Sequence, residues 1–241
     1  MSTRRRILVL NQYYWPGVEA TAQLLAQLCE ALARDYDVTV VTGHLHGHQL
    51  PDEEERNGVR IVRVRSTTYE RSQLHHRAAN YGSYLGESVR AALRGERPDL
   101  VLCMTDPPVV GDIGLVVARR FDVPLLVISQ DVFPEIAERV KRLEHPLVLG
   151  ALRKLVGLYL RRADRVVAIG ETMKLRLVHK GAREGRIEVI PNWVDTSEIQ
   201  PHPRRNAWSA ARGLDDELVV MHSGNIGHAQ DLDTLVRAAT F

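Results

Sequence analysis

Short apolar runs alternate along this chain with longer stretches in which apolar residues recur every three or four positions. The runs have the length of strands, and the longer stretches have the period of amphipathic helices. The first run, 7–10, is followed by a turn at Pro16-Gly17 and then by a helical pattern. One face of that predicted helix carries Leu24, Leu25, Leu28, Ala31 and Leu32.

The alternation continues to residue 190 and predicts a sheet with helices between its strands. Predicted strands cover 7–10, 38–41, 59–64, 100–103, 125–128, 166–169 and 187–190. Predicted helices after the first cover 71–94, 109–121, 136–163 and 171–179. Continuous apolar strands separated by helices indicate a parallel sheet that is covered on both faces, with right-handed crossovers. The sequence therefore predicts an α/β fold, a doubly wound parallel sheet, in a Rossmann-like domain over 1–199.

The rhythm changes after residue 199. A polar stretch with Pro201 and Pro203 predicts a linker over 200–215, and a strand at 218–221 then leads into a helix from about Gln230. We interpret 216–241 as the first strand–helix unit of a second domain. Because such a pair cannot bury its own apolar face, we expect the chain to be a fragment of a longer protein. The alternative is that the last strand joins the first sheet or a partner chain.

Composition narrows the class of protein. The hydrophobic fraction of 44% is enough for a core, and the net charge is only +2, with acidic and basic residues interspersed, so we expect no nucleic-acid partner. Cys29 and Cys103 each lie in an apolar stretch, as buried free thiols of a reducing cytosol do. No run approaches the ~20 apolar residues of a membrane span. We expect a cytoplasmic protein, at most associated with the inner face of the cell membrane.

Ligands of open parallel sheets bind beyond the carboxyl ends of the strands, and candidate residues follow several predicted strands. In the loop after the first strand, which includes Tyr14, Gly17 allows close backbone approach and Glu19 can start a helix whose N–H groups face an anion. Asp106 follows another strand, either as a site residue or as the cap of the next helix.

The segment Asp131–Glu135 is the strongest candidate for catalysis. Asp131 follows a buried strand directly and precedes a Pro turn, which places its carboxylate to orient a hydroxyl or to take a proton. The alternative for both carboxylates is helix capping and pairing with the helix dipole. We favour function for Asp131 and the structural role for Glu135.

Two other loops carry weaker signals. His44, His46 and His48 alternate as zinc ligands can, but we find no carboxylate or thiol at ligand spacing nearby and expect solvated histidines and no metal. The small-residue loop 223–227 suits phosphate binding between a strand and a helix.

Six segments in order resemble glycosyltransferase family 4, in particular its bacterial capsule, colanic-acid and O-antigen members. The segments are 36–42, 97–101, 131–135, 163–169, 189–195 and 222–227. The motif Pro191-Asn192-Trp193-Val194-Asp195 with its preceding strand is the most specific of them.

The resemblance implies a retaining enzyme of the GT-B fold with two facing Rossmann-like domains. Such an enzyme transfers a sugar from a nucleoside-diphosphate sugar to a hydroxyl, here in surface polysaccharide or glycolipid synthesis, without a cofactor and generally without a metal. The resemblance places Asp131 near the reacting sugar. It places Tyr14, Gly17, Glu19 and Asp106 in loops that face the donor diphosphate or the acceptor. The donor-binding residues that it implies are Asn192, Ser223, Gly224, Asn225 and Gly227.

Some positions depart from the family pattern. Many relatives have a glycine at Pro16, an arginine at Asn225 and a lysine near Gln230. The glutamates with which the family grips the donor lie in the second domain, so we expect the chain by itself to be inactive. Alternatives are a nucleotide-sugar 2-epimerase of the same fold and a non-catalytic module that binds an acceptor or docks to another subunit.

The predicted helix around 146–162 has basic residues beside a broad apolar face, including Arg153, Lys154 and Arg161. This pattern is typical of an interfacial helix at an anionic membrane surface, where a lipid-linked acceptor would lie. The alternative is a core helix with one solvated basic edge.

Overall fold

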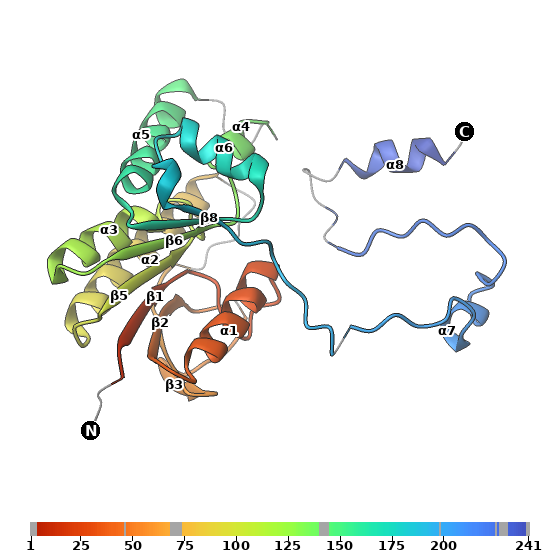
Figure 1. Cartoon of the computed structure of the whole chain (residues 1–241), viewed down its shortest axis with the longest axis horizontal. Helices are drawn as coiled ribbons and strands as arrows, with labels where there is room; N and C mark the ends of the chain where they lie inside the picture. Colours follow the sequence, from red (N-terminus) through yellow and green to blue (C-terminus); the bar gives the residue numbers. More distant parts are fainter. Residues whose placement is uncertain are drawn as a thin grey trace. The chain divides into compact units, whose positions relative to one another are not determined.

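The chain divides into two units, Met1–Asn192 and Trp193–Phe241. The structure, a computed structural model, describes residues 4–45, 47–67, 74–139, 145–197, 199–224, 226 and 231–239 (Figure 1). No helix within these described ranges has both the length and the apolar character that a membrane span requires.

Unit 1 is built around an eight-stranded sheet in the order β3-β4-β2-β1-β5-β6-β7-β8. The strands are β1 Arg6–Leu10, β2 Asp37–Gly43, β3 Glu53–Arg56, β4 Val59–Val64, β5 Leu100–Met104, β6 Leu125–Ser129, β7 Arg165–Ala168 and β8 Ile187–Val189. The helices are α1 Ala20–Leu32, α2 Leu74–Arg94, α3 Val110–Phe121, α4 Glu135–Arg139, α5 Pro146–Arg162 and α6 Glu171–His179, with a 3₁₀ turn at Glu184–Arg186. All ladders are parallel except that of β3 with β4, which confirms the predicted doubly wound α/β fold.

The antiparallel strand β3 was not predicted. It forms a hairpin with β4 through Asn57 and Gly58, whose φ angles of 48° and 80° both lie in the left-handed region. Asn-Gly is the preferred pair for such a tight hairpin turn. The strand itself has the sequence Glu-Glu-Glu-Arg and no apolar alternation, so only the Asn-Gly turn could have indicated the hairpin.

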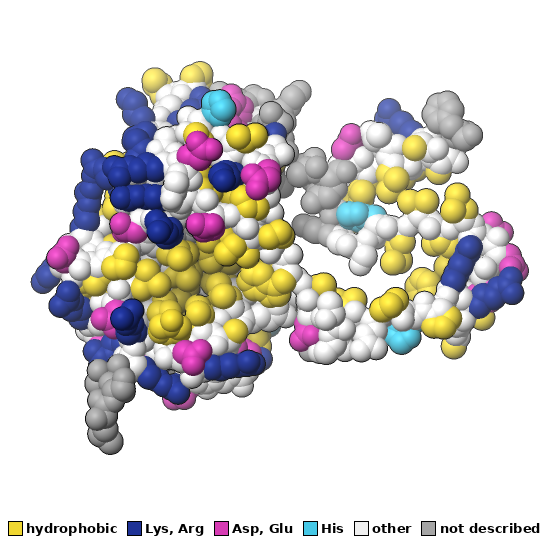
Figure 2. Space-filling model, in the orientation of Figure 1, with side chains coloured by type: hydrophobic (Ala, Val, Ile, Leu, Met, Phe, Trp, Pro, Cys, Tyr) yellow, Lys and Arg dark blue, Asp and Glu magenta, His cyan; other side chains and the backbone are white. Residues whose placement is uncertain are grey.

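The core forms two layers, one on each face of the sheet. Ile7 and Val9 of β1 face the layer that α1 closes, while Leu8 and Leu10 face the layer built with α2, α3, α5 and α6. Because both faces are covered, successive residues of β1 are buried, and the strand is a continuous apolar run. Figure 2 shows apolar side chains still exposed at the surface of unit 1, over its strands.

Two glycines bring α3 close to its neighbours. A Cβ on Gly114 would stand 2.3 Å from Cys103 Sγ and 3.0 Å from Leu125 Cδ1, and one on Gly111 would stand 2.6 Å from the Tyr159 ring. These contacts are too short for any side chain larger than hydrogen. The glycines therefore set how closely α3 packs on β5, β6 and α5.

The described residues of unit 2 include two short helices, α7 Ala207–Ala210 and α8 Leu232–Ala238. A reciprocal capping box between Asn206 and Ser209 begins α7. The predicted helix near the end of the chain is present as α8. The predicted strand at 218–221 is wrong: no ladder pairs these residues, and Leu218 and Val220 are 91% and 70% exposed. A strand requires a hydrogen-bonded neighbour, and this segment has none among the described residues. The predicted boundaries at 199 and 215 stay predictions.

Candidate active site

Seven parallel strands point their carboxyl ends to one edge of the sheet, and the loops there carry most of the predicted site residues. Three of these loops contain cis prolines, after Trp15, Asp106 and Phe133, behind β1, β5 and β6 respectively. Strands β1, β5 and β6 are neighbours, so the three loops lie beside one another.

Asp106 joins the loops behind β1 and β5. Its backbone N–H donates to Asn11 Oδ1 at 3.1 Å, and its carbonyl accepts from the Gln12 N–H at 2.8 Å. Its carboxylate accepts from the Thr21 hydroxyl at 2.8 Å, at the start of α1. Helix α3 has Val109 at its N-cap and no side-chain cap. Asp106 is therefore not the side-chain cap of α3, which was one of the two roles considered for it from the sequence.

The loops behind β6 and β8 are joined by an amide pair. Gln130 Nε2 donates to Asn192 Oδ1 at 3.1 Å, and Asn192 Nδ2 donates back to Gln130 Oε1 at 2.9 Å. The Gln130 N–H also donates to Thr105 Oγ1 at 3.1 Å. Asn192, predicted as a donor contact, thus lies beside the residue that precedes Asp131. This pairing was not predicted, and its partners are 62 residues apart.

Asp131 and Glu135 are one turn apart and differ in their surroundings. Within the described residues the Asp131 carboxylate makes no hydrogen bond or ion pair, and partial desolvation raises its pKa although the residue is exposed. Glu135 accepts from Lys180 Nζ at 2.6 and 2.7 Å. Burial opposes ionisation of Glu135, but hydrogen bonds and the charges of Lys180 and Arg153 give a net lowered pKa. Two carboxylates with opposite shifts suit different roles, reaction for one and structure for the other.

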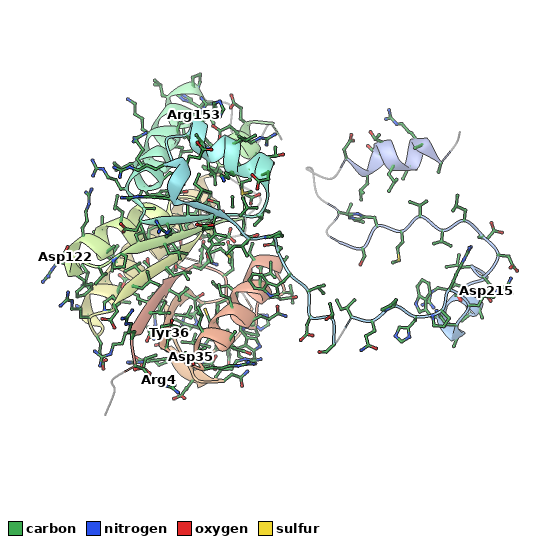
Figure 3. The ribbon with its side chains drawn as sticks, in the orientation of Figure 1. Arg4, Asp35, Tyr36, Asp122, Arg153 and Asp215 are labelled. Atoms are coloured by element: carbon green, nitrogen blue, oxygen red, sulfur yellow. The ribbon has the colours of Figure 1, made fainter. Side chains whose placement is uncertain are left out.

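A groove of about 580 Å³ opens beside these carboxylates. Asp131 lines it from the loop after β6 and Glu135 from the start of α4. Met173 and Arg176 line it from α6, and Lys180 from the C-cap of that helix. Arg153, which projects from α5 in Figure 3, also lies 3.6 Å from Glu135. The site therefore offers one free carboxylate next to an open space large enough for a sugar-sized ligand.

The loop behind β1 corrects part of the prediction. Tyr14 is 2% exposed, packs in the layer under α1, and has a pKa raised by burial, so its side chain is a core residue and faces no ligand. A Cβ on Gly17 would stand 2.8 Å from the Tyr14 carbonyl, whose oxygen accepts the Gly17 N–H. A tight turn accounts for this glycine. Glu19 is half-buried at the N-cap of α1 without a side-chain cap bond.

A buried arginine that the sequence did not single out holds this loop in place. The Arg63 side chain, 1% exposed, donates to the carbonyls of Trp15 at 3.2 Å and Pro51 at 3.1 Å and pairs with Glu54. Its position on the inward face of β4, in register with Val59 and Ile61, was the available signal. One guanidinium thus ties the loop that leads into α1 to β3 and to the segment before β3.

The histidine segment is tied to a carboxylate. His44 Nε2 lies 2.9 Å from Asp52 Oδ1, so one of these histidines has a carboxylate partner eight residues along the chain. Hydrogen bonding to His44 and Arg65 lowers the pKa of Asp52. His48 is exposed, and His46 lies outside the described residues. Among the residues that the structure describes, no three His, Cys, Asp or Glu side chains are arranged to hold a metal ion.

The predicted phosphate loop belongs to unit 2. Ser223 and Gly224 are exposed there, while Asn225 and Gly227 lie outside the described residues. The donor-binding role of this loop stays a prediction.

The fold is that of a Rossmann-like domain, and the loops with the candidate site residues of unit 1 lie at the carboxyl edge of its sheet. Residues 18–193 match the model of the glycosyl transferase 4-like domain, and the chain belongs to this family. It is 29% identical over 213 residues to a D-inositol 3-phosphate glycosyltransferase of Nocardiopsis dassonvillei, covering 86% of this chain and 48% of the relative.

Solved structures show the same fold at low identity. The sucrose-phosphate synthase of Thermosynechococcus elongatus superposes with a TM-score of 0.73 at 17% identity, over 98% of this chain and 59% of that one. HepE of Anabaena, in complex with UDP-glucose, superposes with a TM-score of 0.65 at 14% identity, over 97% and 57%. The chain therefore spans about half the length of the curated relative and somewhat more of the structures.

Proposed function

We propose that the chain supplies the acceptor side of a retaining glycosyltransferase, which moves a sugar from a nucleoside-diphosphate sugar to a hydroxyl. The family supports the class of reaction. The solved neighbour that holds UDP-glucose supports a nucleotide-sugar donor by analogy of fold. No cofactor enters this proposal, because the nucleotide sugar is itself the substrate.

One observation carries the proposal: the Asp131 carboxylate stands without a partner among the described residues, at the carboxyl edge and beside the groove. The Gln130–Asn192 pair fixes the backbone next to it. A carboxylate whose pKa is raised can accept a hydrogen bond from an acceptor hydroxyl and orient its oxygen. Departure of the diphosphate would be assisted by donors aimed at the charge that develops on it.

The test is Asp131→Asn in the full-length protein. Loss of a positioned orienting or acid–base group costs about 10²–10⁴-fold, so we expect kcat to fall at least about 100-fold with the melting temperature unchanged. Asp122→Asn is the matched control, because Asp122 is an exposed residue with φ 54°, a conformation that Asn tolerates. The labelled Asp122 lies well away from Arg153 in Figure 3. Near-normal turnover of Asp131→Asn would remove the basis of the proposal.

We place the enzyme in surface polysaccharide or glycolipid synthesis, with unit 1 touching the cytoplasmic face of the membrane through α5. Much of the apolar face of α5 is used for packing, since Leu149, Val156 and Leu160 are buried. The most exposed large apolar residues of α5 lie at the start of the helix. Leu147 is 79% exposed, and Val148 beside it is also exposed. An apolar tip with basic residues farther along the helix supports contact with an anionic bilayer.

A further inference from the structure

The groove beside Asp131 has charges that are already paired. Lys180 directs its ammonium at both oxygens of Glu135, and Arg153 approaches the same carboxylate at 3.6 Å while it also pairs with Glu138. Glu135 is therefore neutralised from two sides. The charges of Lys180 and Glu135 are paired with each other and are not available to a ligand.

Two other charged groups that line the groove form no ion pair with the residues that the structure describes. One is the Asp131 carboxylate on the α4 side. The other is Arg176 on α6, whose guanidinium is exposed and makes no hydrogen bond or ion pair with any residue that the structure describes. Arg176 lines the same groove as Asp131 but comes from a different wall.

The remaining lining restricts what fits. Met173 and Ile136 add apolar surface, and His179 lines the α6 wall with its Nδ1 held by the Leu175 carbonyl at 2.8 Å. A guanidinium presents a planar fork of donors that matches the two oxygens of a carboxylate or a phosphate. The groove thus combines an acceptor of hydroxyl protons, some apolar surface and a free receptor for an oxyanion.

We infer that this groove binds the acceptor substrate, and that the acceptor is an acidic sugar or polyol whose carboxylate or phosphate pairs with Arg176 while a hydroxyl faces Asp131. The inference rests on the proposed function, which it deepens by naming the substrate class.

Binding to the purified chain tests this inference without requiring turnover. Three probes of matched size are titrated by calorimetry and NMR: glucose, glucuronic acid and glucose 6-phosphate. We expect at least one acid to bind at least about tenfold more tightly than glucose, a difference of about 1.4 kcal/mol. Arg176→Gln should remove this preference and leave glucose binding unchanged. Arg176→Lys should restore part of it, because the charge remains and the fork is lost.

Arg183→Gln is the matched control, since Arg183 is an exposed arginine just beyond α6 that does not line the groove. A preference for glucuronic acid identifies a carboxylate acceptor, and one for glucose 6-phosphate a phosphorylated acceptor; both support the inference. Equal affinity for the three probes, an unchanged preference in Arg176→Gln, or displacement of the acid by UDP would overturn it. So would no binding of either acid at about 20 mM, where even a millimolar site is filled.

The two failures can be told apart. If the acids do not bind but Asp131→Asn still abolishes transfer in the full-length protein, the enzyme stands and only its acceptor class is wrong. If the acids bind through Arg176 but Asp131→Asn transfers normally, the groove stands and the proposed catalytic role fails.

Discussion

Asp112 in the first turn of α3 should weaken the fold at neutral pH. Both of its carboxylate oxygens are buried, and neither has a hydrogen-bond partner among the described residues. Burial alone raises its pKa from 3.8 to about 7. The ionised form therefore costs stability, and Asp112→Asn removes that cost while it keeps the shape of the side chain.

The size and sign follow from the two pKa values. Because the folded-state pKa is raised above the unfolded value, the native state binds more protons between pH 4 and pH 7, and stability falls as pH rises through this window. The full cost is about 4 kcal/mol above pH 7, and at pH 5 it is still below about 2 kcal/mol. The advantage of Asp112→Asn should therefore grow by about 2–3 kcal/mol from pH 5 to pH 8. The buried amide of Asn has its own cost, but this cost does not change with pH.

Thermal unfolding of the purified chain measures the difference. About 2–4 °C per kcal/mol is usual for a domain of this size, so the gap in melting temperature between variant and wild type should widen by about 5–10 °C between pH 5 and pH 8. Asp122→Asn, on the exposed end of the same helix, should show no such widening. A gap that is the same at both pH values would refute the reasoning and mean that Asp112 is paired or hydrated.

Two further predictions concern packing and the membrane. Gly114→Ala should destabilise unit 1 by about 1–3 kcal/mol through overpacking against β5. Gly150→Ala, with no atom within 4 Å of its new Cβ, should instead stabilise α5 by about 0.5–1 kcal/mol. Denaturant unfolding of both variants measures these changes in the free energy of unfolding. Sedimentation with anionic vesicles should recover the wild type at low salt and lose Leu147→Ser combined with Lys154→Glu, and wild type that stays in solution would refute membrane contact.

The fold could be predicted because its strands are buried on both faces. Val38 and Val40 of β2 are buried in one layer of the core and Val41 in the other, so the valines of this strand identify it without any knowledge of its partners. The helices between such runs fix the parallel direction, since a parallel pair requires a long crossover. The prediction of a strand at 218–221 failed because it too used only the local apolar pattern. Those residues have the composition of a strand, but a strand also needs a neighbour to pair with, and the local pattern does not contain that information.

The site was only partly predictable. Asp106 and Asp131 stand directly after buried strands, which the strand pattern alone locates. Their partners do not follow from it, because Glu135 meets Lys180 across 45 residues and Gln130 meets Asn192 across 62. Tyr14 was misplaced for a related reason: its position in a loop indicated exposure, but the turn at Gly17 directs the ring under α1. The strand pattern thus located the polar residues of the loops, but it did not predict which residues they contact.

The strand order explains why the catalytic candidates gather where they do. From β1 the chain leaves through α1 toward β2 on one side, and from β5 it leaves through α3 toward β6 on the other, with α1 and α3 on opposite faces of the sheet. The point between β1 and β5, where the connections diverge, is where ligands of open sheets commonly bind. Asp106 links the loops behind these two strands through Asn11 and Thr21, so polar contacts hold the loops there. Asp131 follows the next strand, β6, so its loop neighbours that of Asp106 at the same edge of the sheet. The strand order therefore brings the proposed acceptor groove next to the edge position where a second substrate is most readily accommodated.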